Sequence, residues 1–486
     1  MSETGSGKHD DPDSEDSELL GPAGAHEFHP LTGLWITDET TPDDLVGDNA
    51  ADADHSPPAW DFDDDEFADD SSDEFDLALA ETVAEQLTAP NSLSPPASPP
   101  SHAPSAGQAL TAPAPIMIIS RPHTNSRVVP ATLRGLRRAT GGSVTLAAAC
   151  TLRQITPAAA DTYMSGCTAA SIRVADPVAH TAYDSVPGRK AASPTTLRWP
   201  FQRYSDPDVD EATWLIDVIQ AQRTVGANTL LTPGRFLPNN DPVIELDTAI
   251  RHLDLVRSQA QNEPVLLNLV LATNWMTNPH RVDDLAERAI EARPDGVWLT
   301  TLWPQLTTAG QPVDLQLLAG YRDLCRALED EAIPLLLPTT DLTGWWCLGH
   351  GATGFGTGLS AAARAFTPAQ TGGGTGNPPK PRILTPELLH TILRSEYDPL
   401  VTAGLVTDCR CPHCLTSRNT ADWDASTQAG HHLFRLAELT ADVDRGAHIA
   451  GLVNTALTTA NMARSAVALE RESVPRHLPL WQQLRA

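Results

Sequence analysis

Three of the seven cysteines stand within six residues near the C-terminal end of the chain, as Cys409, Cys411 and Cys414. This C-x-C-x-x-C spacing lets three thiolates face one ion from a single tight turn. Zn²⁺ prefers four nitrogen or sulfur ligands in a tetrahedron, so one further ligand is required. A site with four protein ligands has no open position and is structural rather than catalytic. The alternative is a loop of free, oxidisable thiols.

Four histidines are candidates for the fourth ligand. His413 lies between two of the cysteines, where its side chain is expected to point away from the ion. His431, His432 and His448 follow downstream. Spacing within the loop leaves all three downstream histidines open.

The charge of the chain is concentrated in its first ninety residues. They hold 27 of the 62 acidic residues and one basic residue, Lys8. The rest of the chain carries 35 acidic and 32 basic residues, so its net charge is near zero and does not by itself require a nucleic-acid partner. The acidic and then Pro-rich composition predicts a disordered segment over residues 1–114, with order beginning at Ile116.

The sequence favours a cytoplasmic protein with no membrane partner. It contains no run of eighteen apolar residues, and its first residues lack the apolar core of a signal peptide. A thiolate cluster beside scattered cysteines is typical of a reducing compartment. The scattered cysteines are Cys150, Cys167, Cys325 and Cys347.

Apolar runs alternate with amphipathic segments between residues 116 and 366. The run Val265–Leu271 predicts a buried strand, and residues 281–292 have the apolar spacing of a helix. Because the strands lack polar alternation, both faces should be covered, as in a parallel sheet. This pattern predicts a (β/α)₈ barrel over residues 115–397, with an open doubly wound sheet as the alternative. A helical subdomain holding the metal site is expected over residues 398–486, preceded by a helix at Pro386–Arg394.

Side chains that follow the strands of a parallel barrel gather at one face. Thr232, Gly234 and Phe236 follow one predicted strand, and Asp341 follows another. An aromatic ring can stack a nucleobase, and glycine lets the backbone approach a phosphate or a base edge. The alternatives are core rings, a tight glycine turn and an N-cap role for Asp341. A Gly-rich run over 351–358 follows, with Gly354, Phe355 and Gly356.

Taken together, these residues resemble the tRNA-guanine transglycosylase superfamily, including its relatives that modify DNA with deazaguanines. That family is a zinc-bearing (β/α)₈ barrel whose C-x-C-x-x-C loop follows a Pro-Leu-Asp-type segment, and Asp398-Pro399-Leu400 precedes the loop here. In the family a His-Leu pair and an acid-containing helix lead to a last ligand histidine. Here the segment 432–438 leads to His448. The resemblance therefore implies Zn²⁺ held by Cys409, Cys411, Cys414 and His448.

At the catalytic positions the sequence departs from the family, which uses one aspartate as nucleophile on the ribose and another as acid/base. Thr232 stands where the acid/base is expected, and a glycine of the 351–358 run stands where the nucleophile is expected. Neither side chain can replace a carboxylate that must attack and then leave. Asp341 is then the candidate catalytic acid. Thr232, Gly234 and Phe236 would hold the base, with Gly354, Phe355 and Gly356 lining the pocket.

Three functions are compatible with these residues. The first is a pentosyltransferase that exchanges guanine or a 7-deazaguanine in tRNA or DNA through a glycosyl-enzyme intermediate, after the base leaves its stack. The second is a non-catalytic, zinc-containing subunit that binds nucleic acid or serves as a scaffold. It would pair with a catalytic partner subunit or form a homodimer. The third is a barrel enzyme acting on a small molecule.

Overall fold

The computed structural model describes residues 27–29, 34–36, 104–121, 126, 128–153, 155–179, 198–203, 210–238, 242–304, 311–359, 363–368, 381–416, 423 and 425–484. Most of the predicted disordered segment and residues 370–380 lie outside this described part. Within that segment the structure describes one antiparallel pair, β1 (Glu27–His29) with β2 (Leu34–Ile36).

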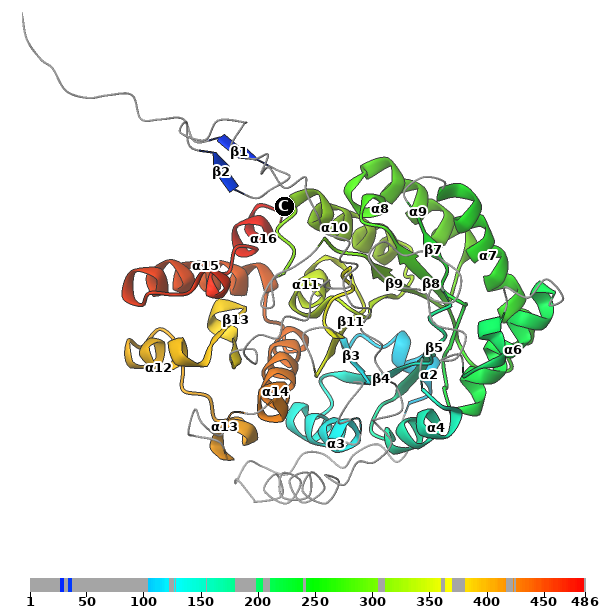
Figure 1. The fold of residues 1–486 in the computed structure, drawn as a ribbon, viewed down its shortest axis with the longest axis horizontal. Coiled ribbons are helices and arrows are strands. Elements are labelled where there is room, and N and C mark those ends of the chain that lie inside the picture. The colour runs from blue at the N-terminus through cyan, green and yellow to red at the C-terminus, as the bar shows by residue number, and fades with distance from the viewer. Residues whose placement is uncertain are drawn as a thin grey trace, which may run out of the picture. The chain divides into compact units, whose positions relative to one another are not determined.

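Eight parallel strands form the centre of the fold, and the predicted (β/α)₈ barrel is confirmed (Figure 1). The strands follow the order β5-β4-β3-β11-β10-β9-β8-β6. A parallel bridge between Val174 of β5 and Thr229, next to β6, joins the two ends of this order and closes the barrel. The strands are β3 (Ile116–Ser120), β4 (Thr145–Thr151), β5 (Ile172–Asp176), β6 (Leu230–Leu231), β8 (Val265–Leu271), β9 (Gly296–Thr301), β10 (Leu335–Leu337) and β11 (Gly354–Gly358), and the short β7 (Phe236–Leu237) also pairs with β8.

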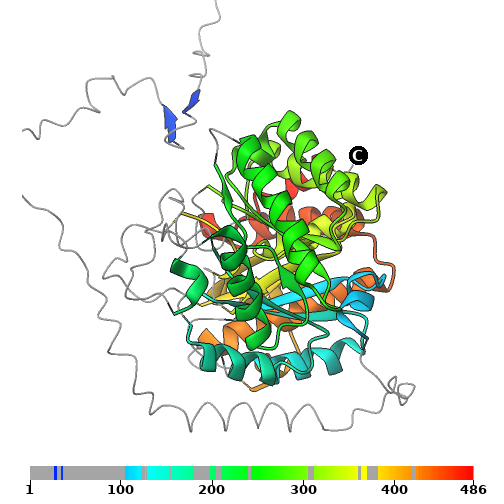
Figure 2. The same ribbon diagram turned by 90° about the vertical axis from the view of Figure 1, so that its right-hand side faces the viewer.

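Helices surround the barrel because each strand has a second apolar face to bury (Figures 1 and 2). In α9 the buried residues Val282, Leu285, Ala286 and Ala289 recur at the predicted helical spacing. The surrounding helices are α3 (Val128–Thr140), α4 (Pro157–Gly166), α6 (Glu211–Thr224), α7 (Pro242–Gln259), α8 (Asn274–Thr277), α9 (Pro279–Ala292), α10 (Leu315–Asp330), α11 (Asp341–Cys347) and α14 (Ala425–Asp444).

Alternation along the strands sorts side chains to the inside or the outside of the barrel wall. On β11, Phe355 belongs to the large cluster between the strands and the helices. Leu336 of β10 and Trp298 of β9 belong to a separate inner cluster of twelve residues. The short helix α2 (Ala106–Leu110) adds Ala109 and Leu110 to this inner cluster, so order begins before the predicted start at Ile116.

The C-terminal elements gather on one side of the barrel (Figure 1). They begin with a hairpin of β12 (Arg382–Thr385) and β13 (His390–Leu393), so the helix predicted over Pro386–Arg394 is wrong. The remaining elements are the helices α12 (Arg394–Thr402), α13 (Pro412–Thr416), α15 (Ile449–Ala466) and α16 (Leu478–Gln483). No helix in the described part of the chain has the length and apolar character needed to cross a membrane.

Candidate metal centre and barrel mouth

The three cysteines of the C-x-C-x-x-C loop converge on one histidine, His431. Its Nδ1 lies 3.6 Å from Sγ of Cys409, 3.5 Å from Sγ of Cys411 and 3.1 Å from Sγ of Cys414. All four donor atoms lie within 4.8 Å of one another. Tetrahedral ligands about 2.0–2.3 Å from an ion are separated by about 3.3–3.8 Å, so the four donors fit around a single metal ion. We refer to these four residues as the clamp.

Backbone hydrogen bonds shape the cysteine loop. The amide of Cys411 donates to Sγ of Cys409 at 3.5 Å, and the amide of Cys414 donates to Sγ of Cys411 at 3.4 Å. The amide of Cys409 donates to the hydroxyl of Tyr397, which itself donates to the carbonyl of Thr407. These contacts turn the sulfurs inward and leave their lone pairs available to a metal.

The orientation of His431 is set on the side away from the sulfurs. Its Nε2 lies 2.8 Å from the carbonyl oxygen of Leu384 in β12, which can only accept a hydrogen bond. Nε2 therefore carries the proton, and Nδ1 presents its lone pair to the sulfurs. A backbone partner on the second ring nitrogen is the usual support of a metal-ligating histidine. The clamp thus ties α14 to the β12–β13 hairpin.

The prediction of His448 as the fourth ligand is wrong. The helix α14 places His431 near its N-terminal end, beside the loop, whereas His448 is the exposed N-cap of α15. At 1.5 Å per residue, about 20 Å of helix separates His431 from the end of α14, and His448 lies beyond that end. The match of segment 432–438 to the family's spacing therefore does not identify the fourth ligand in this chain. The three cysteine assignments are confirmed as members of the metal-fitting group.

His432, the neighbour of His431, points at the barrel instead of the clamp. Its Nε2 donates to Oδ1 of Asp341 at 2.8 Å, and Thr357 of β11 donates its hydroxyl to the same oxygen at 2.6 Å. Burial alone would raise the pKa of Asp341, but His432, Arg364 and the Thr357 hydroxyl hold it well below its usual range. Burial and the charge of Arg364 lower the pKa of His432, and the carboxylate of Asp341 opposes that shift.

Asp341, the predicted catalytic acid, is therefore placed on the outer side of the barrel wall. Its partner Thr357 is two residues from Phe355 on β11, which faces the surrounding helices, and its other partner is on α14. Its side chain is buried, and its φ of 48° is a conformation that non-glycine residues rarely adopt. Such strain persists only where surrounding contacts over-determine the backbone. The geometry makes Asp341 a link between the barrel and the clamp helix.

The residues predicted to hold a base are mostly inside the wall. Phe236 is buried in β7, and Phe355 is buried between strand and helices. Gly354 and Gly356 belong to β11, where an added Cβ would stand 2.6 Å from Cβ of Ile116 and 1.9 Å from the carbonyl oxygen of Pro338 respectively. These two glycines therefore serve close strand packing.

Thr232 and Gly234 lie beside Asn268 of β8. The Thr232 hydroxyl accepts from the backbone N–H of Asn268 at 2.8 Å, and an added Cβ on Gly234 would stand 2.3 Å from the side-chain Nδ2 of Asn268. The φ of Gly234 is +74°, so glycine is required there both for its conformation and for this close approach.

Asp176, which the sequence analysis missed, ends β5 and faces into the barrel mouth. It follows Ile172 and Val174 at the period-two spacing of the inner cluster, and it is partly exposed. Its Oδ1 accepts from the amide of Val178 at 2.9 Å and from Nδ2 of Asn268 at 3.3 Å. Burial raises the pKa of Asp176, although its hydrogen bonds with Val178, Asn268 and the side chain of Trp298 oppose that rise. The alternation of inward- and outward-facing residues along β5 could have indicated from the sequence that Asp176 faces inward.

The side chains of Asn268 and Trp298, both 1% exposed, lie next to Asp176. The indole of Trp298 interacts with the Asp176 carboxyl, whereas Oδ1 of Asn268 has no partner within the described residues. A buried acceptor left unpaired is costly, at about 1–3 kcal/mol. The inner side of the barrel therefore holds a carboxyl beside one unpaired acceptor.

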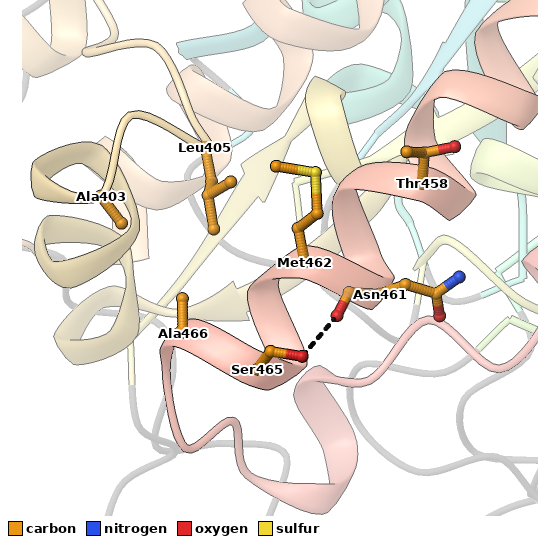
Figure 3. Close-up of a pocket in the computed structure, with 7 residues that line it drawn as sticks. All are labelled: Ala403, Leu405, Thr458, Asn461, Met462, Ser465 and Ala466. Carbon is orange, nitrogen blue, oxygen red and sulfur yellow. Dashed lines mark hydrogen bonds between the residues drawn. The ribbon is translucent and has the colours of Figure 1, made fainter.

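Two surface cavities lie among the C-terminal elements. One of about 590 Å³ borders the clamp, where the guanidinium of Arg394 lies over the rings of Tyr397 and Trp423. The other, of about 580 Å³, lies between the end of α12 and α15 (Figure 3). Its lining contains no titratable side chain and consists of Ala403, Leu405, Thr458, Asn461, Met462, Ser465 and Ala466.

Comparisons with known proteins add no functional assignment. No family model matches the sequence, and no curated protein matches it. Among solved structures, a crystal structure from Coccidioides immitis assigned as a fructose-1,6-biphosphate aldolase matches at 10% identity and a TM-score of 0.30. That alignment covers 67% of this chain and 90% of the other. A likeness this distant carries no argument about the reaction of this barrel.

Proposed function

We propose that the chain is a transglycosylase-type enzyme that exchanges a guanine or a 7-deazaguanine base in tRNA or DNA at the barrel mouth. The observation that carries this proposal is the group formed by Asp176, at the carboxyl end of β5, with Asn268 and Trp298, which lie within β8 and β9. Catalytic groups of parallel barrels gather at the face where the strands end, and Asp176 lies there.

The polar atoms of the group suit the edge of a purine lactam. Such an edge offers an N–H donor beside a carbonyl acceptor. The N–H matches the unpaired Oδ1 of Asn268, and the carbonyl would accept from Nε1 of Trp298 in place of the Asp176 carboxyl. A base held there would lie against the carboxyl of Asp176. This arrangement requires the nucleotide to leave its stack, as base-modifying enzymes require.

Asp176 is suited to proton transfer. A carboxyl whose pKa is raised by burial keeps a proton that it can give to a departing base, and it can take one back from the N–H of the incoming base. We assign the acid/base role to Asp176 rather than to Asp341, whose Oδ1 is already occupied by two donors.

The clamp would hold Zn²⁺ as a structural ion. Three sulfurs and one imidazole nitrogen form a donor set preferred by zinc, and they complete a tetrahedron without an open position. A bound ion would cross-link the cysteine loop to α14. The base exchange itself would be carried out by side chains of the barrel.

A non-catalytic, nucleic-acid-binding or scaffold subunit is the second candidate. It is favoured by the burial of Phe236 and by the closed packing around Gly354 and Gly356, which remove the predicted base-stacking pocket. In that case the protein would bind nucleic acid without exchanging a base, alone or with a catalytic partner.

Incorporation of a labelled guanine or 7-deazaguanine into tRNA and DNA tests the proposal. Asp176→Asn should lower the rate by about 10²–10⁴-fold, the range expected for losing an acid/base group. The matched control is Asp161→Asn, an exposed aspartate on the neighbouring α4, which should leave the rate unchanged. Absence of incorporation by the wild-type protein on both substrates would reject the enzyme and favour the second candidate.

A further inference from the structure

The sequence contains a long segment that is free of acidic residues. No aspartate or glutamate occurs between Glu85 and Asp161, although six arginines occur there. The barrel as a whole is close to neutral, so this segment forms a local excess of positive charge. Three of its arginines, Arg134, Arg137 and Arg138, belong to α3.

The three arginines of α3 are exposed on the face away from the core. Val129, Leu133 and Leu136 of the same helix are buried against the barrel. None of the three arginines forms a salt bridge with a described residue, and Arg138 donates only to the backbone carbonyl of Arg134. Arg137 and Arg138 lie in the last turn, where they favour the helix dipole. That effect does not account for Arg134, which lies a turn earlier.

Arginines on other barrel helices form salt bridges with acidic side chains. Arg251 of α7 pairs with Glu211 at 2.8 Å, and Arg223 of α6 pairs with Glu263 at 2.8 Å. Arg288 of α9 pairs with Asp247. Within the described helices, α3 is thus the place where three neighbouring arginines face solvent with their charge uncompensated.

The helix α3 connects the barrel mouth to the clamp side of the molecule. It follows β3, whose last residue Ser120 lies at the mouth end of the strand. It also packs against α14, the helix that carries His431 (Figure 1). Arg134 to Arg138 cover about 6 Å of the helix and begin about 9 Å from its start, so the arginine face lies on the outer wall in the second half of α3, where a nucleic acid that reaches the mouth would continue along the wall.

We propose that this arginine track, formed by Arg134, Arg137 and Arg138, binds the phosphate backbone of the nucleic acid whose target nucleotide enters the barrel mouth. The inference rests on the proposed function for the identity of its partner. Guanidinium groups bind phosphate oxygens directly, and each neutralised phosphate releases condensed counterions. The track would thus supply affinity and position without reading sequence.

Binding of the full-length chain to a tRNA transcript and to a DNA duplex, measured across a range of salt concentrations, tests the track. The variant R134Q/R137Q/R138Q should bind at least about tenfold more weakly, and its plot of log K against log salt should be shallower by about two to three units. The charge-retaining R134K/R137K/R138K should keep most of the salt dependence, because lysine also binds phosphate.

The charge-matched control is R251Q/R288Q/R293Q on α7, α9 and the turn after α9. It removes three positive charges from another part of the surface and should change the slope far less. Equal slopes and affinities for the two glutamine triples would overturn the proposal. Matching thermal midpoints would show that both variants fold.

An unchanged or higher affinity of the α3 variant, together with a larger hydrodynamic radius, would also overturn the proposal. That result would assign the track to the chain's own acidic segment. The test is independent of base exchange. If the track is correct and the proposed reaction is not, the α3 variant loses binding while the wild-type protein binds but incorporates no base.

Discussion

The clamp and the barrel mouth are built from the chain in opposite ways. The clamp takes four ligands from residues 409–431, and three of them come from one six-residue loop. The mouth takes Asp176, Asn268 and Trp298 from three strands that are scattered along the chain. The clamp donors face a common centre, whereas the mouth leaves the acceptor Oδ1 of Asn268 unpaired.

The clamp is arranged for stability and the mouth for binding. A closed donor set gains its free energy when an ion is bound and then changes little. Unpaired buried atoms cost free energy until a ligand meets them. The link from His432 to Asp341 connects the regions, because consecutive residues of α14 serve the clamp and the barrel wall.

The largest expected effect concerns the clamp. His431→Ala should abolish stoichiometric metal binding and make the C-terminal elements sensitive to protease, because metal binding to such sites supplies on the order of 10 kcal/mol. His448→Ala is the matched control and should retain about one metal ion per chain. Elemental analysis and limited proteolysis check both variants. Equal metal content in the two would contradict the assignment of His431.

Lowering the pH should change the contributions of the two regions to the free energy of unfolding in opposite directions. Burial lowers the pKa of His390, in strand β13 of the hairpin, to about 4, whereas burial raises the pKa of Asp176 in the mouth. The unfolded state takes up the His390 proton first, so this histidine alone should lower the free energy of unfolding by about 1.4 kcal/mol per pH unit between pH about 6.5 and about 4. Other buried histidines with lowered pKa values add to the fall, namely His252, His350, His432 and His477. The folded state takes up the Asp176 proton first and partly offsets that fall.

Urea unfolding at several pH values checks this contrast. His390→Gln should flatten the decline, and Asp176→Asn should steepen it. The two variants and the wild-type protein must be compared at equal metal content, since acid also protonates the clamp ligands. A decline of unchanged slope in His390→Gln would exclude this histidine as its source.

A smaller effect is expected where the two regions meet. His432→Asn cannot place a donor at the position of Nε2, and it leaves the buried Asp341 with one hydrogen bond fewer, at a cost of about 1–3 kcal/mol. His432→Gln keeps a donor at nearly that position and should cost less. Thermal unfolding compares the pair. Equal losses would show that packing, and not the hydrogen bond, accounts for the role of His432.

The smallest effect in this series concerns a single Cβ in the mouth. Gly234→Ala should destabilise the fold by about 1–2 kcal/mol, through a strained φ and through displacement of Asn268. Gly404→Ala is the matched control, because its φ of +69° is similar but no atom lies within 4 Å of an added Cβ. The difference between the two unfolding free energies isolates the contact with Asn268. A difference near zero would mean that Asn268 moves freely.

Much of the barrel was predictable because its signals are local. The apolar run Val265–Leu271 is β8 to the residue, and the helical spacing of residues 281–292 is that of α9. The hairpin at β12 and β13 was not predictable in the same way, because its strands are short and its form depends on the clamp and on neighbouring helices. The helix α2 was also missed, because its few apolar residues gain burial only inside the closed barrel.

The order of residues alone determined the cysteine ligands, since a six-residue loop can bring three sulfurs together whatever surrounds it. Only the tertiary structure decided the fourth ligand, because several histidines follow and helix geometry selects the one that reaches the loop. It likewise decided that Asp176 faces the mouth and that Asp341 turns toward α14. Those two aspartates have the same chemistry in sequence, and their roles differ because the wall of a barrel has an inside and an outside.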